Sequence, residues 1–290
     1  MNTKTARRAR GFTLVELLVV IAIIGVLAAI LIPTLYRVVV KARQNVIAQE
    51  LNQLHLAIES YKQKFGDYPP DFTNVTASAD LTNASHLVAR HMRKAFPKHQ
   101  ENLQTAFWDS TNSKCKLDPS EALVFWLSQL WEDPRLPLTG TGNHVVLFPF
   151  DEKRLIDPDG DTFPSYAPPS GKDMPYVYFD SRIYTDATPI SSSNTKPVAS
   201  LCVYKDSAGT AVLYPYASKA SATALLSMAN KTTYQLISAG LDGEYGDVTG
   251  ITAGTASTYK VFPFGTNYKI GDMDNIANFS DGKIFEDHLE

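Results

Sequence analysis

The chain has 290 residues and a formal net charge of −3, with 27 Lys and Arg against 30 Asp and Glu. This mildly acidic balance argues against nucleic-acid binding, which depends on clustered basic surface. The apolar share of 44% is ample for a folded core, and the length allows one large domain or two small ones. The two cysteines, Cys115 and Cys202, are compatible with an exported domain, and the sequence leaves open whether they form a disulfide or two separate thiols.

The N-terminal segment joins a short leader to a long apolar run. Residues 1–11 carry the basic side chains Lys4, Arg7, Arg8 and Arg10. The run from Leu14 to Ile32 contains a single charged residue, Glu16. As a helix this run would be about 28 Å long, close to the ~30 Å hydrocarbon core of a bilayer. The pattern therefore predicts a membrane-inserting helix.

Two ordinary explanations of this helix fit less well. A cleaved secretory signal has an apolar region of about 7–15 residues followed by an A-x-A-like site. This run is longer, and Ala28-Ala29-Ile30 is the nearest approach to such a site. A plain anchor explains the length but gives no role to Gly11 or Glu16. Because an isolated acid at mid-membrane costs about 2.5–3.5 kcal/mol, we expect Glu16 to have a partner.

The stretch GFTLVE, from Gly11 to Glu16, resembles the processing site of type IV pilins and type II secretion pseudopilins. The resemblance implies that prepilin peptidase cuts after Gly11 and methylates the new amino terminus, Phe12. Phe12 and Glu16 are four residues apart and share a helix face. The resemblance also implies that the Phe12 ammonium of a neighbouring subunit neutralises Glu16 inside a filament, which removes the penalty of an unpaired buried charge.

Helical periodicity continues beyond the apolar run. Apolar side chains recur at spacings of three and four residues, which predicts one buried helix face. They are Ile47, Leu51, Leu54, Ile58 and Tyr61. The sequence GDYPP at residues 66–70 suits a helix end, because glycine favours the C-cap and prolines cannot continue a helix.

We therefore expect one helix from Phe12 to about residue 65, weakened at Pro33, where a backbone donor is missing. The resemblance implies that residues 12–36, with Pro33 among those that serve filament assembly, form the membrane and filament core. It implies that residues 37–66 form an amphipathic continuation that lies on a globular sheet.

The region 67–173 has an irregular pattern that predicts a variable insert of helices and loops. Asp118 as N-cap, proline at the next position and Glu121 reaching back predict a short buried helix over residues 122–127. A further helix is expected within residues 83–107. Residues 157–162, DPDGDT, place oxygens at positions 1, 3 and 5 of an EF-hand-like loop, but the later glycine and glutamate are missing. This favours a polar turn over an ion site.

The pattern of region 174–290 predicts antiparallel strands. They are expected over residues 175–179 and 234–238, and residues 201–204 and 211–214 are expected to pair as a hairpin. The predicted fold class is therefore α+β and pilin-like: a long N-terminal helix packed on an antiparallel sheet, with a helical and loop insert.

Residues 234–247 and 272–279 are similar to the C-terminal region of major type II pseudopilins, in which a glycine-rich loop binds calcium. The resemblance implies Asp242 and either Asp274 or Asn275 as calcium ligands, with Asp247 as a further candidate. Oxygen-only ligands suit calcium, and glycines let backbone carbonyls turn inward. The insertion 248–271 departs from the family pattern, and a solvated acidic turn is the alternative.

The sequence contains no H-E-x-x-H, C-x-x-C, G-x-S-x-G or Walker motif, so we do not expect an enzyme. The resemblance implies a structural subunit of a type II secretion pseudopilus, anchored by one span in the inner membrane with its globular part in the periplasm. Its expected partners are copies of itself, prepilin peptidase, other pseudopilins and the inner-membrane secretion platform. A type IV pilin, a minor pseudopilin, or a membrane-tethered enzyme or binding domain are the alternatives.

We predict that prepilin peptidase removes residues 1–11. Intact mass of the membrane-extracted protein should then correspond to a methylated chain that begins at Phe12. In cells without the peptidase the leader should remain, and a bulky residue in place of Gly11 should block the cut. A chain that still begins at Met1 in peptidase-competent cells would contradict this prediction.

Overall fold

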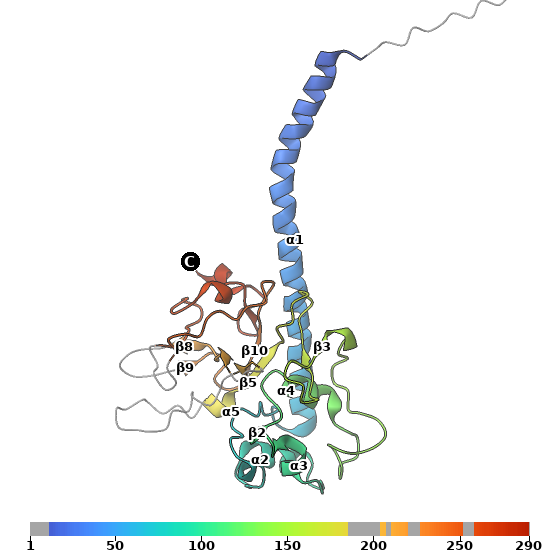
Figure 1. Cartoon of the computed structure of the whole chain (residues 1–290), viewed down its shortest axis with the longest axis vertical. Helices are drawn as coiled ribbons and strands as arrows, with labels where there is room; N and C mark the ends of the chain where they lie inside the picture. Colours follow the sequence, from blue (N-terminus) through green and yellow to red (C-terminus); the bar gives the residue numbers. More distant parts are fainter. Residues whose placement is uncertain (1–11, 185–203, 207–209, 220–226, 252–257, 290) are drawn as a thin grey trace, which may run out of the picture. The chain divides into compact units, whose positions relative to one another are not determined.

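A computed structural model of the protein describes residues 12–184, 204–206, 210–219, 227–251 and 258–289. The chain divides into two compact units, Met1–Arg43 and Gln44–Glu290, and each is described by itself. Helix α1, Leu14–Phe65, is the long blue coil of Figure 1 and contributes to both units. The prediction of one long helix is confirmed, and Pro33 lies inside it without ending it.

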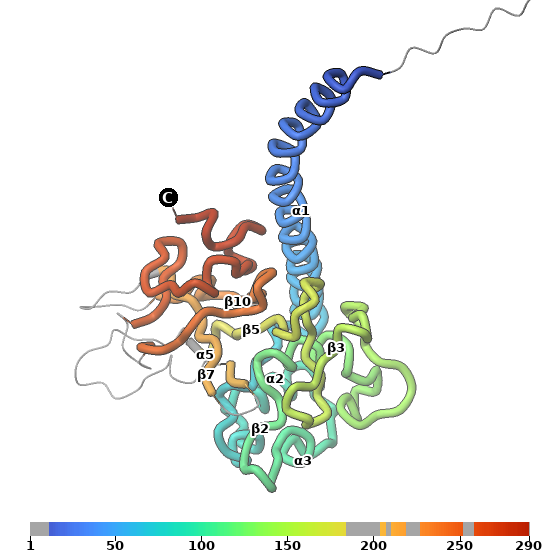
Figure 2. The backbone as a smooth tube through the Cα atoms, turned by 45° about the horizontal axis from the view of Figure 1, so that its top comes forward, coloured from blue at the N-terminus to red at the C-terminus, as the bar shows by residue number. Residues whose placement is uncertain are grey.

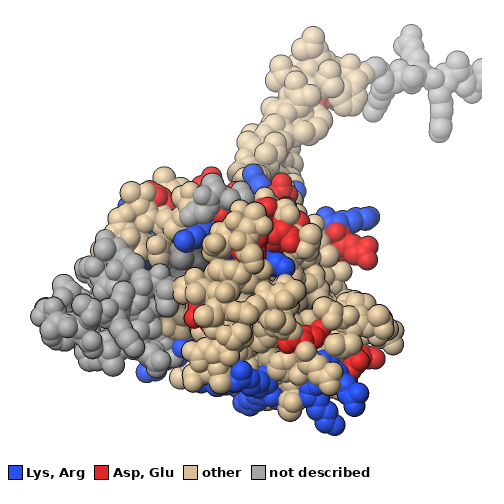
Figure 3. Space-filling view, turned by 60° about the horizontal axis from the view of Figure 1, so that its bottom comes forward, with Lys and Arg blue, Asp and Glu red and all other residues tan. Residues whose placement is uncertain are grey.

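In the first unit α1 is long and apolar enough to cross a membrane. Its Leu, Ile and Val side chains are exposed all around the helix. Figure 3 shows this segment as almost uniformly uncharged, whereas both acidic and basic side chains are spread over the visible face of the second unit. The visible face of the second unit therefore mixes both signs of charge.

In the second unit the predicted apolar stripe of α1 is the buried face of the helix. Each of its members is at most 2% exposed: Ile47, Leu51, Leu54, Ile58 and Tyr61. The helix ends at Phe65, as predicted. Gly66 follows with a φ of +82°, and its N–H donates a hydrogen bond to the Lys62 carbonyl at 2.7 Å.

The central sheet has the strand order β11–β10–β5, all antiparallel. These strands are Ile276–Ala277, Tyr234–Ser238 and Val177–Asp180, and β5 and β10 lie side by side in Figure 2. Alternate residues face two different cores: Tyr178 of β5 packs in the cluster that contains the α1 stripe, whereas Val177 and Phe179 pack in a C-terminal cluster. The sheet is buried on both faces.

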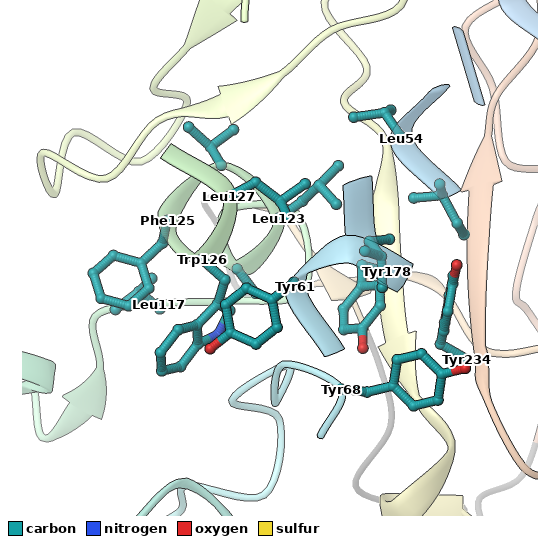
Figure 4. Close-up of a cluster of buried hydrophobic side chains, with 14 of the residues drawn as sticks. Leu54, Tyr61, Tyr68, Leu117, Leu123, Phe125, Trp126, Leu127, Tyr178 and Tyr234 are labelled. Carbon is teal, nitrogen blue, oxygen red and sulfur yellow. The ribbon is translucent and has the colours of Figure 1, made fainter. Parts of the chain in front are cut away.

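The insert joins the first of these cores. Trp126 packs edge-on to Tyr61 with ring centroids 6.0 Å apart, as Figure 4 shows. The indole N–H of Trp126 donates to the Pro70 carbonyl at 2.8 Å, and the Tyr178 hydroxyl donates to the Pro69 carbonyl at 2.8 Å. The proline pair that ends α1 therefore supplies acceptors to two buried aromatic residues.

The remaining elements are short. The insert contains α2 Leu87–Ala95, α3 Leu103–Phe107, β1 Trp108–Asp109, β2 Lys114–Cys115, α4 Ala122–Val124 continued by a π turn over Phe125–Gln129, β3 Leu155–Ile156 and β4 Ser165–Tyr166. Then follow α5 Ser181–Tyr184, β6 Tyr204–Lys205, β7 Ala211–Leu213, β8 Ala217–Lys219 and β9 Ser227–Met228. Short 3₁₀ turns occupy Ser78–Leu81, Glu152–Arg154, Ile270–Asp272 and Phe285–His288.

Most element predictions hold, with local corrections. Strand 234–238 is confirmed to the residue, and strand 175–179 is shifted to Val177–Asp180. The helix expected within residues 83–107 is confirmed, and it is divided into two, α2 and α3, because Phe96 precedes a proline and leaves the helical region at φ −130° and ψ 74°. In the predicted hairpin, β6 pairs with β7, while residues 201–203, including Cys202, lie outside the described residues.

We predict that the buried face of α1 supports the second unit. Ile58→Ala should lower the free energy of unfolding by about 2–5 kcal/mol, because Ile58 is fully buried and its truncation leaves a cavity. Leu56→Ala is the matched control, since Leu56 is 64% exposed on the same helix. Thermal unfolding of the full-length protein in detergent, followed by circular dichroism, measures both. Equal losses in the two variants would contradict this packing.

Candidate functional site

The helix N-terminus carries a reciprocal pair of hydrogen bonds between Thr13 and Glu16. The Glu16 N–H donates to Thr13 Oγ1 at 3.2 Å, and the Thr13 N–H donates back to Glu16 Oε2 at 2.8 Å. The Thr13 hydroxyl also donates to the same Oε2 at 2.8 Å. This is a capping box, and its T-x-x-E signature is readable in the sequence, although Thr13 is not among the predicted site residues.

Among the described residues, the Glu16 carboxylate accepts hydrogen bonds only from uncharged donors on Thr13, and both of these bonds go to Oε2. The neighbouring Phe12 is 73% exposed, and Gly11 lies outside the described residues. The arrangement therefore fixes the carboxylate at the end of the helix. Its pairing with the Phe12 amine of another subunit stays a prediction.

Among the predicted calcium ligands, Asp274 is held by three donors. Its Oδ2 accepts the N–H groups of Leu241 and Asp242, the latter at 3.1 Å, and its Oδ1 accepts the Gln44 side-chain amide at 3.1 Å. Gly240 is required here, because with φ +65° an added Cβ would lie 2.1 Å from the Asp274 carbonyl oxygen. Asp274 thus ties the C-terminal loop to the second part of α1.

The other three candidate ligands have different surroundings. Asp242 accepts the Glu244 N–H at 2.9 Å, and burial together with the nearby charges of Asp274 and Glu244 raises the pKa of Asp242. Asp247 accepts the N–H of Thr249 at 2.7 Å within its own exposed turn.

Asn275 is fully buried and donates to the Tyr216 hydroxyl at 2.9 Å. Its Oδ1 has no hydrogen-bond partner in the described part of the chain. The structure therefore brings Asp242 and Asp274 together and does not gather all four residues into one oxygen cage. In this geometry backbone N–H groups, rather than carbonyl oxygens, face Asp274.

The insertion 248–271 contributes a buried ion pair that the sequence did not indicate. Lys260 Nζ donates to Asp272 Oδ1 at 2.6 Å and to the Tyr245 carbonyl at 3.1 Å. The Tyr216 hydroxyl donates to the same Oδ1 at 2.5 Å. Burial lowers the pKa of Lys260, and the charge of Asp272 opposes that shift. This pair anchors the insertion to the segment that precedes Asp274.

A second acidic group lies in the insert. One carboxylate oxygen from each of Glu121, Asp159 and Asp161 lies within 4.8 Å of the other two. Glu121 belongs to the predicted capping box, which is confirmed: the Asp118 N–H donates to Glu121 Oε2 at 3.0 Å, and Asp118 Oδ1 accepts the Glu121 N–H at 3.2 Å. Burial and the neighbouring carboxylates raise the pKa of Glu121 to about 10.

Comparison with known proteins supports the N-terminal resemblance. Residues 6–32 match the family model for the prokaryotic N-terminal methylation motif. The chain is 41% identical over 64 residues to the type IV major pilin protein PilA of Myxococcus xanthus. It is 48% identical over 56 residues to the type IV wide pilus major component PilA4 of Thermus thermophilus, and 31% identical over 91 residues to the type II secretion system core protein G of Escherichia coli.

These alignments are partial on both sides. They cover 21%, 19% and 31% of this chain, respectively. They span 29%, 43% and 63% of the lengths of the three relatives. No solved structure gives a significant match to the chain.

Proposed function

We propose that the chain is a structural subunit of a type II secretion pseudopilus, because it matches the N-terminal methylation motif at the start of a long apolar helix and is similar there to core protein G of the type II secretion system. The observation that carries this proposal is the alignment with core protein G of E. coli, which extends over 91 residues and 63% of that relative. A type IV pilin is the second candidate, because pilins of M. xanthus and T. thermophilus match at 41% and 48% identity.

In the proposed role the protein is a mechanical component and not an enzyme. The apolar part of α1 anchors the subunit, with the proposed location in the inner membrane and the second unit in the periplasm. Copies then assemble through residues 12–36. The proposed partners are prepilin peptidase, other pseudopilins and the inner-membrane secretion platform.

The chemistry of assembly depends on Glu16. Cleavage after Gly11 frees the amine of Phe12, and methylation keeps its positive charge. Because the capping box engages Glu16 through Oε2 alone, the proposed partner amine is the charge that compensates the carboxylate. Pairing between subunits removes an unpaired charge from an apolar environment, which is costly for either group alone.

We predict that assembly requires the charge of Glu16 and not its cap. Glu16→Gln keeps an oxygen that accepts the Thr13 N–H but removes the charge, and should reduce filament yield at least about tenfold. Thr13→Ala is the matched variant: it removes the hydroxyl cap, costs about 1 kcal/mol at the helix end and should still assemble. Filaments counted by electron microscopy, with subunit levels in the membrane fraction as control, measure both. Normal assembly of Glu16→Gln would exclude the charge-pairing proposal.

The proposal includes a calcium ion at the C-terminal loop, with Asp242 and Asp274 as the adjacent carboxylates. A ligand that binds only the folded protein at a hundredfold excess over Kd stabilises it by ~2.7 kcal/mol. Calcium should therefore raise the melting temperature of the full-length protein in detergent. Magnesium should substitute poorly, because it demands tighter octahedral geometry.

Two matched variants test which carboxylates are needed for the rise in melting temperature with calcium. Asp242→Ala should remove the part of the calcium response that belongs to this loop. Asp247→Asn should keep it, because Asp247 bonds within its own turn. If Asp242→Ala responds to calcium as the unaltered protein does, the C-terminal loop is an ordinary acidic turn.

A further inference from the structure

Helix α2 presents basic side chains to solvent. Its inner side packs Val88 and Met92 into the core, where both are fully buried. Its outer side carries the exposed Arg90 and Arg93, and the exposed Lys98 follows the helix. Within the described part of the chain, none of these three cations forms an ion pair with a carboxylate. We call Arg90, Arg93 and Lys98 the basic face.

Two acids that could balance the basic face are engaged elsewhere. Asp67 pairs with Arg182 at 2.8 Å and with Lys94, the remaining base of α2, at 3.6 Å. Glu101, three residues after Lys98, accepts the backbone N–H of Leu138 at 3.0 Å and the N–H of the residue that follows it. The basic face therefore keeps its positive charge.

An open cleft in the C-terminal part of the second unit carries the opposite charge. Its volume is about 750 Å³, and Glu244, Asp247 and Glu286 line it together with a single base, Lys269. The other lining residues are Gly246, Tyr268, Ile270, Gly271 and Met273. Ile270 is 91% exposed, so the cleft combines apolar surface with carboxylates. Among the described residues, no Lys or Arg forms an ion pair with these three acids.

The basic face and the cleft lie near opposite ends of the part of α1 that belongs to the second unit. At one end Gln44 donates to Asp274, which directly follows the cleft. At the other end Lys94 of α2 donates to the Gly66 carbonyl at 2.8 Å. These two ends are about 33 Å apart along the helix. Figure 1 likewise shows α2 and the C-terminal segment at opposite ends of the second unit. One copy therefore cannot bring the two surfaces together, whereas two copies can.

We propose that the basic face of one copy binds in the acidic cleft of a second copy. Arginine suits this cleft, because its apolar stem covers surface such as Ile270 and Met273 while its guanidinium group pairs with a carboxylate. The contact joins two different surfaces and is therefore heterologous. Such a contact extends into an open filament when the rotation between copies does not close a ring.

This inference rests on the proposed function, because it names how assembled subunits meet outside the apolar part of α1. Exposed ion pairs contribute little affinity one by one. Charge complementarity instead favours the correct neighbour and speeds association, and like charges placed opposite one another oppose it. The contact therefore selects the neighbouring copy and weakens at high salt, since salt screens exposed charges.

The test reverses the charge of each surface in the full-length protein. The basic-face variant combines Arg90→Glu with Arg93→Glu, and the cleft variant combines Glu244→Lys with Glu286→Lys. Two differently tagged copies are expressed together, and their co-purification in detergent at low salt measures association. Each variant paired with itself should co-purify at least about tenfold less than the unaltered protein, because like charges then face one another.

Expression of the two variants together should restore association. In that mixture the reversed basic face meets the reversed cleft, and the two unaltered surfaces also meet. Lys153→Glu with Lys231→Glu is the matched control, because both lysines are exposed and lie outside the two surfaces. This control changes the net charge as much as the basic-face variant does and should associate normally. All variants should melt as the unaltered protein does, because the replaced side chains are exposed.

Normal association of the basic-face variant with itself, or no recovery when the two folded variants are mixed, overturns the contact. If a reversal variant does not fold, Arg90→Gln with Arg93→Gln decides the question, and unchanged co-purification of that pair excludes the contact.

Filaments counted in cells separate this inference from the proposed function. If the basic-face variant alone forms filaments as the unaltered protein does, the contact is wrong and the proposed function stands. If the mixed variants co-purify but the unaltered protein forms no filaments with its secretion machinery, the proposed function fails and the contact stands.

Discussion

The packing of one face of α1 against the tyrosines of β5 and β10 is the contact on which the second unit depends. Ile47 to Tyr61 form that face, and Tyr178 and Tyr234 meet it from the sheet. The same stretch of helix also holds the more distant segments. Glu50 accepts an Arg154 N–H at 2.9 Å from the insert, and Gln44 donates to Asp274 in the C-terminal loop. Loss of the helical face would therefore release the sheet, the insert and the loop together.

The carboxylates of the chain differ in how their charges are compensated. Glu50 pairs with Arg154, and Asp272 pairs with Lys260 inside the fold. Glu16 is capped by Thr13, whose donors are uncharged, so the capping box orients the carboxylate without neutralising it. Within the described part of the chain, Lys114 is the cation that pairs with the acidic group of Glu121, Asp159 and Asp161.

The match to the N-terminal methylation motif concerns the start of the chain, whereas the C-terminal part of the second unit has contacts of its own. The match to the family model falls on residues 6–32, which include the start of the apolar part of α1. In the C-terminal region Gly240 lies close to Asp274, and Lys260 of the insertion forms a buried ion pair with Asp272, which follows the insertion. Residues 258–271 of the insertion are thus packed into the C-terminal cluster, to which Tyr259 and Val261 belong.

The sequence alone determined the features that are encoded within a few neighbouring residues. Local spacing or local hydrogen bonding predicts each of these features, and all of them appear in the structure. They are the apolar stripe of α1, the end of α1 before Gly66, the capping box at Asp118 and strand 234–238.

Only the tertiary structure decided which remote side chains meet. Nothing in the spacing of the chain relates Glu121 to Asp161, Lys260 to Asp272, or Asp274 to the amides of Leu241 and Asp242. Such pairs depend on how helix, sheet and insert pack against one another. That packing is set by many weak contacts between distant segments, and no short pattern in the sequence records it.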